Sequence, residues 1–351
     1  MLPSCSLLLT LALAATPAPP APASVPDGPV KVFILAGQSN MEGKVQNPLF
    51  EHQSTDEATA EMFAHLRDEE GFATRDDVFI KFLGRHGGLT LGYGSPGRTG
   101  VELELGHALG EHYEEPVLLI KAAWGGHSLY KLFRSPSAGL PSEETLQAEL
   151  DQAVQRVERE NEQHNRDNPL PTMEEIVDVY GSSYRNMLAE VRTTYDNLDT
   201  LFPELAGREL ELTGFFWHQG WNDQYNGAEL EYASNMQHFI EDVRRDLEAP
   251  ELPFVIGVMG QNGSEEARGA MLTIQEAQLA MAEVDAFRGN VAAVRTDELV
   301  DTVAEQLYPE WRDRFEEWQL VGSDHKYHYL GSAIWHVRMG RSFAEAMLGM
   351  L

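Results

Sequence analysis

The sequence has very little cysteine, and this scarcity limits the chemistry that the protein can perform. Cys5 is the single cysteine among 351 residues, and it lies inside an apolar N-terminal stretch with the pattern of a signal peptide. Once such a segment is removed, the mature chain has no thiol. We therefore expect neither disulfide bonds nor cysteine-based catalysis.

Basic residues are scarce as well. The 26 Lys and Arg residues face 56 Asp and Glu residues, which gives a formal net charge of −30. A field of this sign repels phosphate groups, so we expect no nucleic-acid partner and no attachment to an anionic membrane surface. The simplest interpretation of the acidity is solubility.

Nucleotide-binding motifs are missing or incomplete. The chain has no Gly-Lys-Ser or Gly-Lys-Thr of the P-loop type. The letters of Gly92–Gly97 fit a dinucleotide fingerprint, but this segment does not directly follow an expected strand and Pro96 interrupts it. We interpret it as a flexible loop that borders the functional site.

The N-terminus predicts export. The apolar run Leu7–Ala15 is too short to span a bilayer but has the length of a signal-peptide core, and small residues follow it, although no Lys or Arg precedes it. We expect residues 1–25 to be a signal peptide and linker, the mature protein to be secreted or periplasmic, and no membrane attachment after processing. Residues 26–351 are expected to form a single domain.

Apolar runs alternate with helical patterns through the rest of the chain, which predicts an α/β fold with a central parallel sheet. The charged segment 135–178 does not follow this alternation of strands and helices, and we interpret it as a partly helical, solvent-facing insertion. The expected strands are Val30–Ala36, Val78–Leu83, Val117–Ala123, Leu212–Trp217, Phe254–Met259 and Val291–Val294. The expected helices are Leu103–Tyr113, Tyr184–Leu198, Leu230–Leu247, Met271–Val284 and Ala333–Met350.

The first expected strand ends in Gly37-Gln38-Ser39-Asn40-Met41. Ligands of an open α/β sheet bind at the carboxyl ends of its strands, so a serine at this point is a candidate nucleophile. The N–H groups at the start of the following helix could stabilise an oxyanion. The alternative is that Ser39 only caps that helix.

Two further strands end in groups that could stabilise an oxyanion. Gly125 and Gly126 follow the third strand, and glycine lets backbone N–H groups approach a reacting carbonyl; a tight turn is the alternative. Gln219 and Asn222 follow the fourth strand and carry amide donors. His218, beside them, is more often an ordinary hydrogen-bonded histidine than a catalyst.

A candidate base lies near the C-terminus. Asp324 precedes His325 and His328, and an acid close to a histidine can fix its tautomer and stabilise the imidazolium that forms when it accepts a proton. The two histidines could instead hold a metal ion, but no third ligand follows a recognisable pattern. We therefore favour proton transfer over metal binding.

Together these blocks resemble the SGNH hydrolases, in particular their carbohydrate acetylesterase branch, which includes sialate O-acetylesterases and some acetylxylan esterases. The Gly-Gln-Ser-Asn-Met motif of that branch is complete at Gly37–Met41. Its Lys-x-x-x-Gly-Gly-x-Ser-Leu block matches Lys121–Leu129, and its Trp-x-Gln-Gly block matches Trp217–Gly220. Asp324 departs from the pattern. In family members the Asp usually lies three positions before the catalytic His, whereas Asp324 lies four positions before His328.

The resemblance implies a three-layer α/β/α sandwich of the flavodoxin-like type and an acyl-enzyme mechanism without cofactor or metal. It implies Ser39 as nucleophile, His328 as base and Asp324 as its orienting acid. The implied oxyanion donors are Ser39, Gly125, Gly126 and Gln219. The residues expected to contact substrate are Gln38, Asn40, Glu102, His127, His218 and Asn222.

The implied substrate is an acetylated carbohydrate, such as sialic acid, xylan or a related glycan. Several aromatic and histidine side chains near the motifs suit stacking on sugar rings and hydrogen bonding to hydroxyls: Trp124, His127, Tyr130, Trp217, His218, Trp221 and Tyr225. Two alternatives remain at this stage. The protein could hydrolyse other short acyl esters, or it could be a non-catalytic carbohydrate-binding protein with the same fold.

Overall fold

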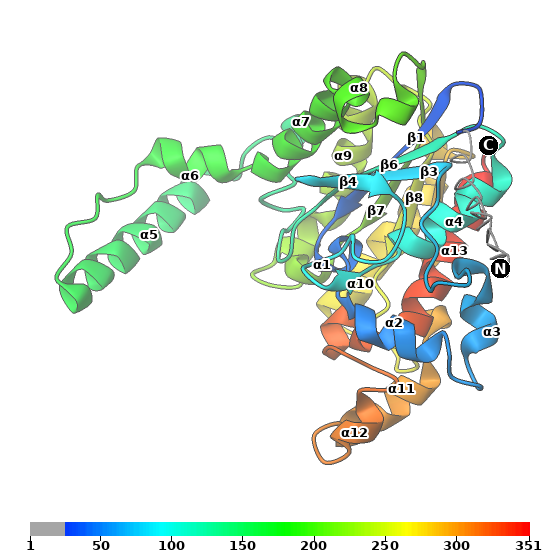
Figure 1. Cartoon of the computed structure of the whole chain (residues 1–351). Coiled ribbons are helices and arrows are strands. Elements are labelled where there is room, and N and C mark those ends of the chain that lie inside the picture. Colours follow the sequence, from blue (N-terminus) through cyan, green and yellow to red (C-terminus); the bar gives the residue numbers. More distant parts are fainter. Residues whose placement is uncertain (1–24) are drawn as a thin grey trace, which may run out of the picture.

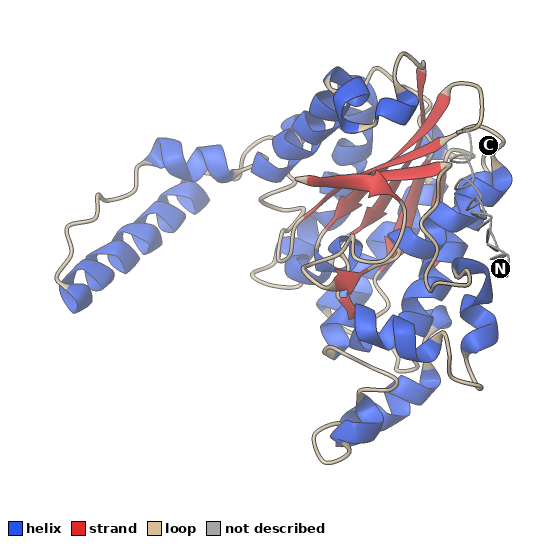
Figure 2. Ribbon diagram, viewed as in Figure 1, coloured by secondary structure: helices blue, strands red, loops and turns tan. Residues whose placement is uncertain are grey.

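A central sheet organises the molecule. The computed structural model describes residues 25–351, so the predicted signal segment and Cys5 lie outside the described residues. Within residues 25–351, seven strands form this sheet in the order β4-β3-β6-β1-β7-β8-β9, with helices on both sides (Figure 2). The strands of the sheet are β1 (Val30–Gly37), β3 (Val78–Phe82), β4 (Arg85–Gly88), β6 (Val117–Ala123), β7 (Leu210–His218), β8 (Phe254–Val258) and β9 (Val291–Arg295); β2 (Val45–Gln46) and β5 (Arg98–Thr99) form a small separate pair.

The predicted apolar runs are confirmed as strands, and the fold class is confirmed as α/β with a mostly parallel sheet. The central strands are buried along their length, because helices cover both faces of the sheet. β4 was not predicted, since it lies in the glycine-rich stretch and lacks an apolar run. It pairs antiparallel with β3 across a tight turn in which Leu83 has a left-handed backbone, with φ of 52°.

Two hydrophobic layers hold the helices onto the sheet. One layer joins α7, α9 and α10 to one face, and the other joins α4 and α13 to the opposite face. These five helices match the predicted ones to within a few residues. The helices are α1 (Ser39–Glu42), α2 (Asn47–Gln53), α3 (Ala60–Phe63), α4 (Glu102–His112), α5 (Glu143–His164), α6 (Met173–Val179), α7 (Ser182–Asp196), α8 (Leu198–Leu201), α9 (Tyr232–Asp246), α10 (Ala270–Ala280), α11 (Thr302–Leu307), α12 (Phe315–Trp318) and α13 (Ala333–Leu348).

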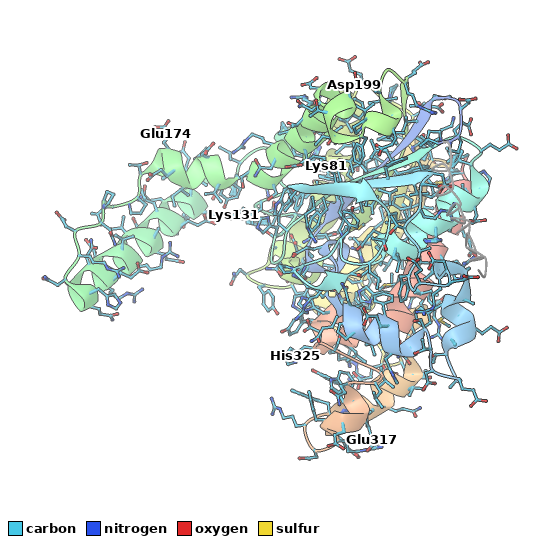
Figure 3. The ribbon with its side chains drawn as sticks, in the orientation of Figure 1. Lys81, Lys131, Glu174, Asp199, Glu317 and His325 are labelled. Carbon is cyan, nitrogen blue, oxygen red and sulfur yellow. The ribbon has the colours of Figure 1, made fainter. Side chains whose placement is uncertain are left out.

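The charged insertion forms a helical arm made of α5 and α6. Figure 1 shows this arm extending away from the sheet, and Figure 3 labels Lys131 at its base and Glu174 on α6. At the base, Glu149 accepts from the Lys131 ammonium at 2.5 Å and from the Tyr180 hydroxyl at 2.7 Å. The prediction of a partly helical, solvent-facing insertion agrees with this arrangement.

The strand order brings three loops together at one edge of the sheet. Gly37 at the end of β1 is in register with Ala123 of β6 on one side and with His218 of β7 on the other. Numbered along the chain, the parallel strands run 2-3-1-4-5-6 in space, which differs from the flavodoxin order 2-1-3-4-5. β1 is therefore a switch point, and ligands of open α/β sheets bind at the carboxyl end of such a point.

A long connecting segment joins β9 to α13. It carries α11 and α12, protrudes at the lower edge of Figure 1, and returns through a turn at Lys326–Gly331 that contacts α1. Among residues 25–351, no helix has the length and apolar character needed to cross a bilayer.

Candidate active site

Ser39 lies at the sharp junction between β1 and α1. Gln38, in extended conformation, is the residue before the helix, and Ser39 is the first helical residue. No side-chain hydrogen bond caps this helix, so the structure gives no support to a capping role for the Ser39 hydroxyl. The side chain is 6% exposed, which leaves it recessed but not sealed.

Glycine is required at the position before this junction. Gly37 has a φ of 149°, and a Cβ atom there would lie 2.2 Å from the His218 carbonyl oxygen. Only a residue without a side chain allows β1 and β7 to approach so closely at their ends. The close approach keeps the loops after these two strands side by side.

The loop after β6 lies next to Ser39. The Trp124 N–H donates to the Gly37 carbonyl at 3.2 Å, and a Cβ atom built on Gly125 would lie 3.8 Å from the Ser39 Cβ. Gly125 and Gly126 are exposed. Their backbone N–H groups are thus accessible beside the serine, as an oxyanion site requires.

The Asp223 side chain holds the loop after β6 in place. The fully buried carboxylate accepts from the backbone N–H groups of Leu129 at 2.9 Å and Tyr130 at 2.7 Å. Burial raises the pKa of Asp223 to about 6, although these hydrogen bonds and one from Gln219 act against it. Sequence reasoning missed this role, because nothing in the Asn222-Asp223 pair shows which loop the carboxylate will reach.

Gln219 does not have a free donor for an oxyanion. Its amide nitrogen donates to Asp223 at 2.6 Å, and the Gln38 side chain and the His127 carbonyl lie within 3.2 Å of the same nitrogen. An amide nitrogen has two hydrogens, and both are engaged here. In this geometry the amide has no free hydrogen for an oxyanion, and the oxyanion role of Gln219 stays a prediction.

Gln38 is also structural. Its side-chain oxygen accepts from the backbone N–H groups of Gly220 and Asn222 at 3.3 Å, and only 2% of the residue is exposed. Its amide joins the ends of β1 and β7, and a substrate contact by Gln38 stays a prediction. Asn222 keeps a more open position: its amide nitrogen donates to the Gly126 carbonyl at 2.6 Å, its second hydrogen has no acceptor among the described contacts, and the residue is partly exposed.

His328 and Asp324 lie together. The Asp324 Oδ1 atom is 3.1 Å from the His328 Nδ1 atom despite the unusual four-residue step. The other Asp324 oxygen accepts from the Arg98 guanidinium, and Oδ1 also accepts from the His325 backbone N–H at 2.7 Å. Burial disfavours the charged carboxylate, but the His328 ring, the His325 N–H and Arg98 outweigh it and hold the pKa of Asp324 well below its usual range.

His325 points elsewhere. Its ring stacks on Tyr327 at 5.3 Å and its Nδ1 atom lies 3.4 Å from the Tyr308 hydroxyl. The carboxylate therefore faces the His328 ring and only the backbone of His325. The metal alternative gains no support, because residues 25–351 contain no group of three or more His, Cys, Asp or Glu side chains arranged to hold an ion.

One contact brings the histidine turn to the serine helix. The Asn40 amide donates to the Tyr327 carbonyl at 3.1 Å, which fixes α1 beside the residue before His328. The described hydrogen bonds do not include one between the Ser39 hydroxyl and the His328 ring. Asn40 is 2% exposed and its amide makes this internal contact, and a substrate contact by Asn40 stays a prediction.

A buried tyrosine supports the histidine turn from beneath. Tyr329 follows His328 with a φ of 51°, and its fully buried hydroxyl lies 3.0 Å from His218 Nε2 and 2.8 Å from Thr296 Oγ1. It also accepts from the Gly260 N–H at 3.1 Å. His218 is 2% exposed and burial lowers its pKa to about 3; a substrate contact by His218 stays a prediction.

Glu102 is an internal ion-pair partner. Its Oε2 atom lies 2.9 Å from the Lys121 ammonium, and both side chains have no exposed surface. Its other oxygen accepts from the Gly100 N–H at 2.9 Å. The pair joins α4 to β6, and a substrate contact by Glu102 stays a prediction. His127 keeps a partly exposed position at the rim, where its Nδ1 atom lies 2.7 Å from the Ser183 hydroxyl.

Comparison with known proteins finds one matching family model. The model described as "Carbohydrate esterase, sialic acid-specific acetylesterase" matches residues 171–306, which is less than half of the chain. This segment is therefore similar to that carbohydrate esterase family. The match contains the block Trp217–Asp223 but neither Ser39 nor His328. The family consists of carbohydrate acetylesterases, which are ester hydrolases.

One solved structure supports the fold, and two others show weaker similarity. A protein from Arabidopsis thaliana is 16% identical, with a TM-score of 0.51 over 91% of this chain and 98% of that one. A carbohydrate acetylesterase from Xanthomonas citri is 14% identical, with a TM-score of 0.42 over 77% of this chain and 51% of that one. NanS is 15% identical, with a TM-score of 0.41 over 77% and 78%. No curated protein matches the chain significantly.

Proposed function

We propose that the protein is a serine esterase that removes O-acetyl groups from carbohydrate, with Ser39 as nucleophile and His328 as base. The observation that carries this proposal is the convergence of Ser39, the exposed Gly125–Gly126 loop and the Asp324–His328 pair at one sheet edge. The family supplies the acetylated carbohydrate, which this arrangement alone would not identify.

The reaction proceeds in two halves. The Ser39 hydroxyl attacks the ester carbonyl while His328 Nε2 accepts its proton, and the sugar oxygen leaves with that proton. Water then attacks the acetyl-serine, again giving its proton to His328, and acetate leaves as the Ser39 hydroxyl is restored. Asp324 stays ionised, because its pKa is low, and it stabilises the imidazolium.

The oxyanion of each tetrahedral intermediate needs donors that have no other partner. Backbone N–H groups of Ser39 and of Gly125 or Gly126 supply two. Asn222 supplies the third in this proposal, because one of its amide hydrogens is free and its other hydrogen already fixes it against the Gly126 carbonyl. This replaces the donor role that the sequence suggested for Gln219.

The test is Ser39→Ala assayed on p-nitrophenyl acetate and on acetylated glycans. We expect kcat to fall at least about a thousandfold, because the oxyanion donors alone retain little of the catalysis. Stability should change by about 1 kcal/mol or less, since the hydroxyl makes no capping hydrogen bond.

Ser54→Ala is the matched control, because Ser54 is 5% exposed, close to the 6% of Ser39, and its hydroxyl only bonds Glu51 and Arg67. Its activity should remain. An organophosphonate should label wild type but not Ser39→Ala. Retained turnover by Ser39→Ala would remove the nucleophile assignment, and failure of folded wild type to react would favour carbohydrate binding without catalysis.

A further inference from the structure

An aromatic ridge runs along the rim of the site. We define it as Trp221, Tyr327, His325 and Trp311, whose successive ring centroids are 6.0, 5.3 and 5.9 Å apart. Tyr327 and His325 are exposed, and the other two rings are partly exposed. The Tyr327 ring also lies 4.5 Å from the His328 ring, so the ridge passes beside the candidate base.

The ridge ends at a cavity of about 500 Å³. Its walls include Trp311, Phe315 and Tyr308, and it shares Asp324 and His325 with the histidine turn. Figure 3 labels His325 at the edge of the molecule, above the protruding segment that carries Glu317. A cavity of this size, with aromatic walls and a few polar groups, is typical of small-molecule sites.

The charged residues that line the cavity favour an uncharged ligand. Among its lining residues, Arg98 and Asp324 carry the permanent charges, and these two bond each other. No unpaired permanent cation is left there for a carboxylate or phosphate. Aromatic faces together with the exposed amide of Gln319 suit the apolar faces and hydroxyl groups of an uncharged sugar.

The segment that forms the wall is held firmly in place. Gln46 bonds Ser323 through its backbone N–H at 3.1 Å and its side-chain amide at 3.3 Å, and the Gln53 amide donates to the Leu320 carbonyl at 3.1 Å. A Cβ atom on Gly322 would lie 2.3 Å from the Trp318 ring, so glycine allows this indole to pack against the turn. Such preformed walls reduce the entropy that ligand binding must overcome.

We propose that the aromatic ridge and the cavity bind uncharged sugar rings of a glycan that continues beyond the acetylated residue. The proposal rests on the esterase function proposed above and specifies its substrate as an acetylated oligosaccharide or polysaccharide with a neutral backbone. A free acetylated monosaccharide would occupy only the site at Ser39 and would gain nothing from the cavity.

The kinetic test compares three substrates of increasing size: p-nitrophenyl acetate, acetylated methyl xyloside and acetylated xylotetraose. Wild type should favour the tetrasaccharide. Trp311→Ala should raise KM for the tetrasaccharide about threefold to tenfold, because one aromatic contact contributes that much to binding. Turnover of the two small substrates should not change. Phe315→Ala should have a smaller effect in the same direction.

Leu140→Ala is the control for loss of an exposed apolar side chain. Leu140 is 51% exposed and Phe315 is 54% exposed, but Leu140 lies beside the helical arm and away from the ridge. We expect wild-type KM for all three substrates. If Trp311→Ala and Phe315→Ala keep wild-type KM for the tetrasaccharide, or if all substrates weaken equally, the inference is wrong.

A binding experiment separates this inference from the esterase proposal. Unacetylated xylotetraose, cellotetraose and mannotetraose are titrated into Ser39→Ala and into Ser39→Ala/Trp311→Ala, with a sialylated trisaccharide as the anionic comparison. Binding of a neutral glycan that weakens without the indole supports the inference even if wild type hydrolyses no ester. Absence of binding by every neutral glycan, or binding of the anionic glycan alone, overturns it.

Discussion

Removing the Tyr329 hydroxyl tests whether the buried network under the histidine turn positions the base. Tyr329→Phe keeps the ring, which packs at 5.0 Å from Trp335, and deletes only the oxygen atom. Thr296 retains a partner, because its hydroxyl also donates to the Val258 carbonyl at 2.6 Å. His218 Nε2 and the Gly260 N–H lose the hydrogen bond that this hydroxyl gives them.

The loss of stability follows from the two buried groups that lose a partner, His218 Nε2 and the Gly260 N–H. Each unsatisfied buried donor or acceptor costs about 1 to 3 kcal/mol, so the free energy of unfolding should fall by about 2 to 6 kcal/mol. For a chain of this size that corresponds to a decrease in Tm of roughly 3 to 9 °C. Thermal unfolding followed by circular dichroism measures it.

Catalysis should suffer separately from stability. Tyr329 and Leu330 both have left-handed backbones, with φ of 51° and 61°, and such conformations persist only where their surroundings hold them. A looser turn displaces the His328 ring, and a displacement of about 1 Å costs on the order of a hundredfold in rate. We therefore expect kcat on p-nitrophenyl acetate to fall about tenfold to a hundredfold at 20 °C, with KM almost unchanged.

Tyr327→Phe is the matched control. Tyr327 lies two residues earlier in the same turn and is 39% exposed, and its hydroxyl makes no hydrogen bond among the described contacts. This variant should keep wild-type Tm and kcat. The reasoning would be refuted if Tyr329→Phe kept both, and a positioning role would be refuted if its Tm fell while kcat well below that temperature stayed at the wild-type value.

Two further experiments test His328 as the base and Asp223 as the residue that holds the loop after β6. His328→Ala should reduce kcat at least a hundred times more than His325→Ala, since Asp324 faces the His328 ring; steady-state kinetics decides, and the reverse order would show that His325 is the base. For Asp223, a folded-state pKa of about 6 against an ordinary value of 3.8 means that the folded protein binds a proton more tightly than the unfolded chain. Its contribution to the free energy of unfolding should thus rise by about 2.5 kcal/mol as the pH falls from 7.5 to 4. Urea unfolding at both pH values should show this contribution in wild type and not in Asp223→Asn, and an identical pH dependence in both would contradict the assigned pKa.

The sequence predicted the sheet well, because buried parallel strands have a local signature. The run Val117–Ala123 is apolar from end to end, and the structure makes the same seven residues a strand. The antiparallel strand Arg85–Gly88 has no such signature. Its pairing depends on the tight turn at Leu83 and on the neighbouring strand, neither of which hydrophobic periodicity records.

The site was predicted at the level of loops and not of side-chain roles. Strand ends at a switch point meet in any such fold, so the motifs were expected to converge. Whether an amide faces outward depends on partners far away in sequence. Gln219 is saturated by Asp223 and a backbone carbonyl 92 positions away, and Glu102 is neutralised by Lys121, so residue type alone could not separate supporting residues from contacts.

The position of β1 at the centre of the sheet has a consequence for how the protein is made. Among the described strands, β1 leaves the ribosome first, yet its two neighbours end only at residues 123 and 218. Until translation has passed both, an apolar strand has open edges on one or both sides, which is a hazard for aggregation. Its companion strands are distant in sequence, so the nascent chain must shield its earliest strand for most of its synthesis.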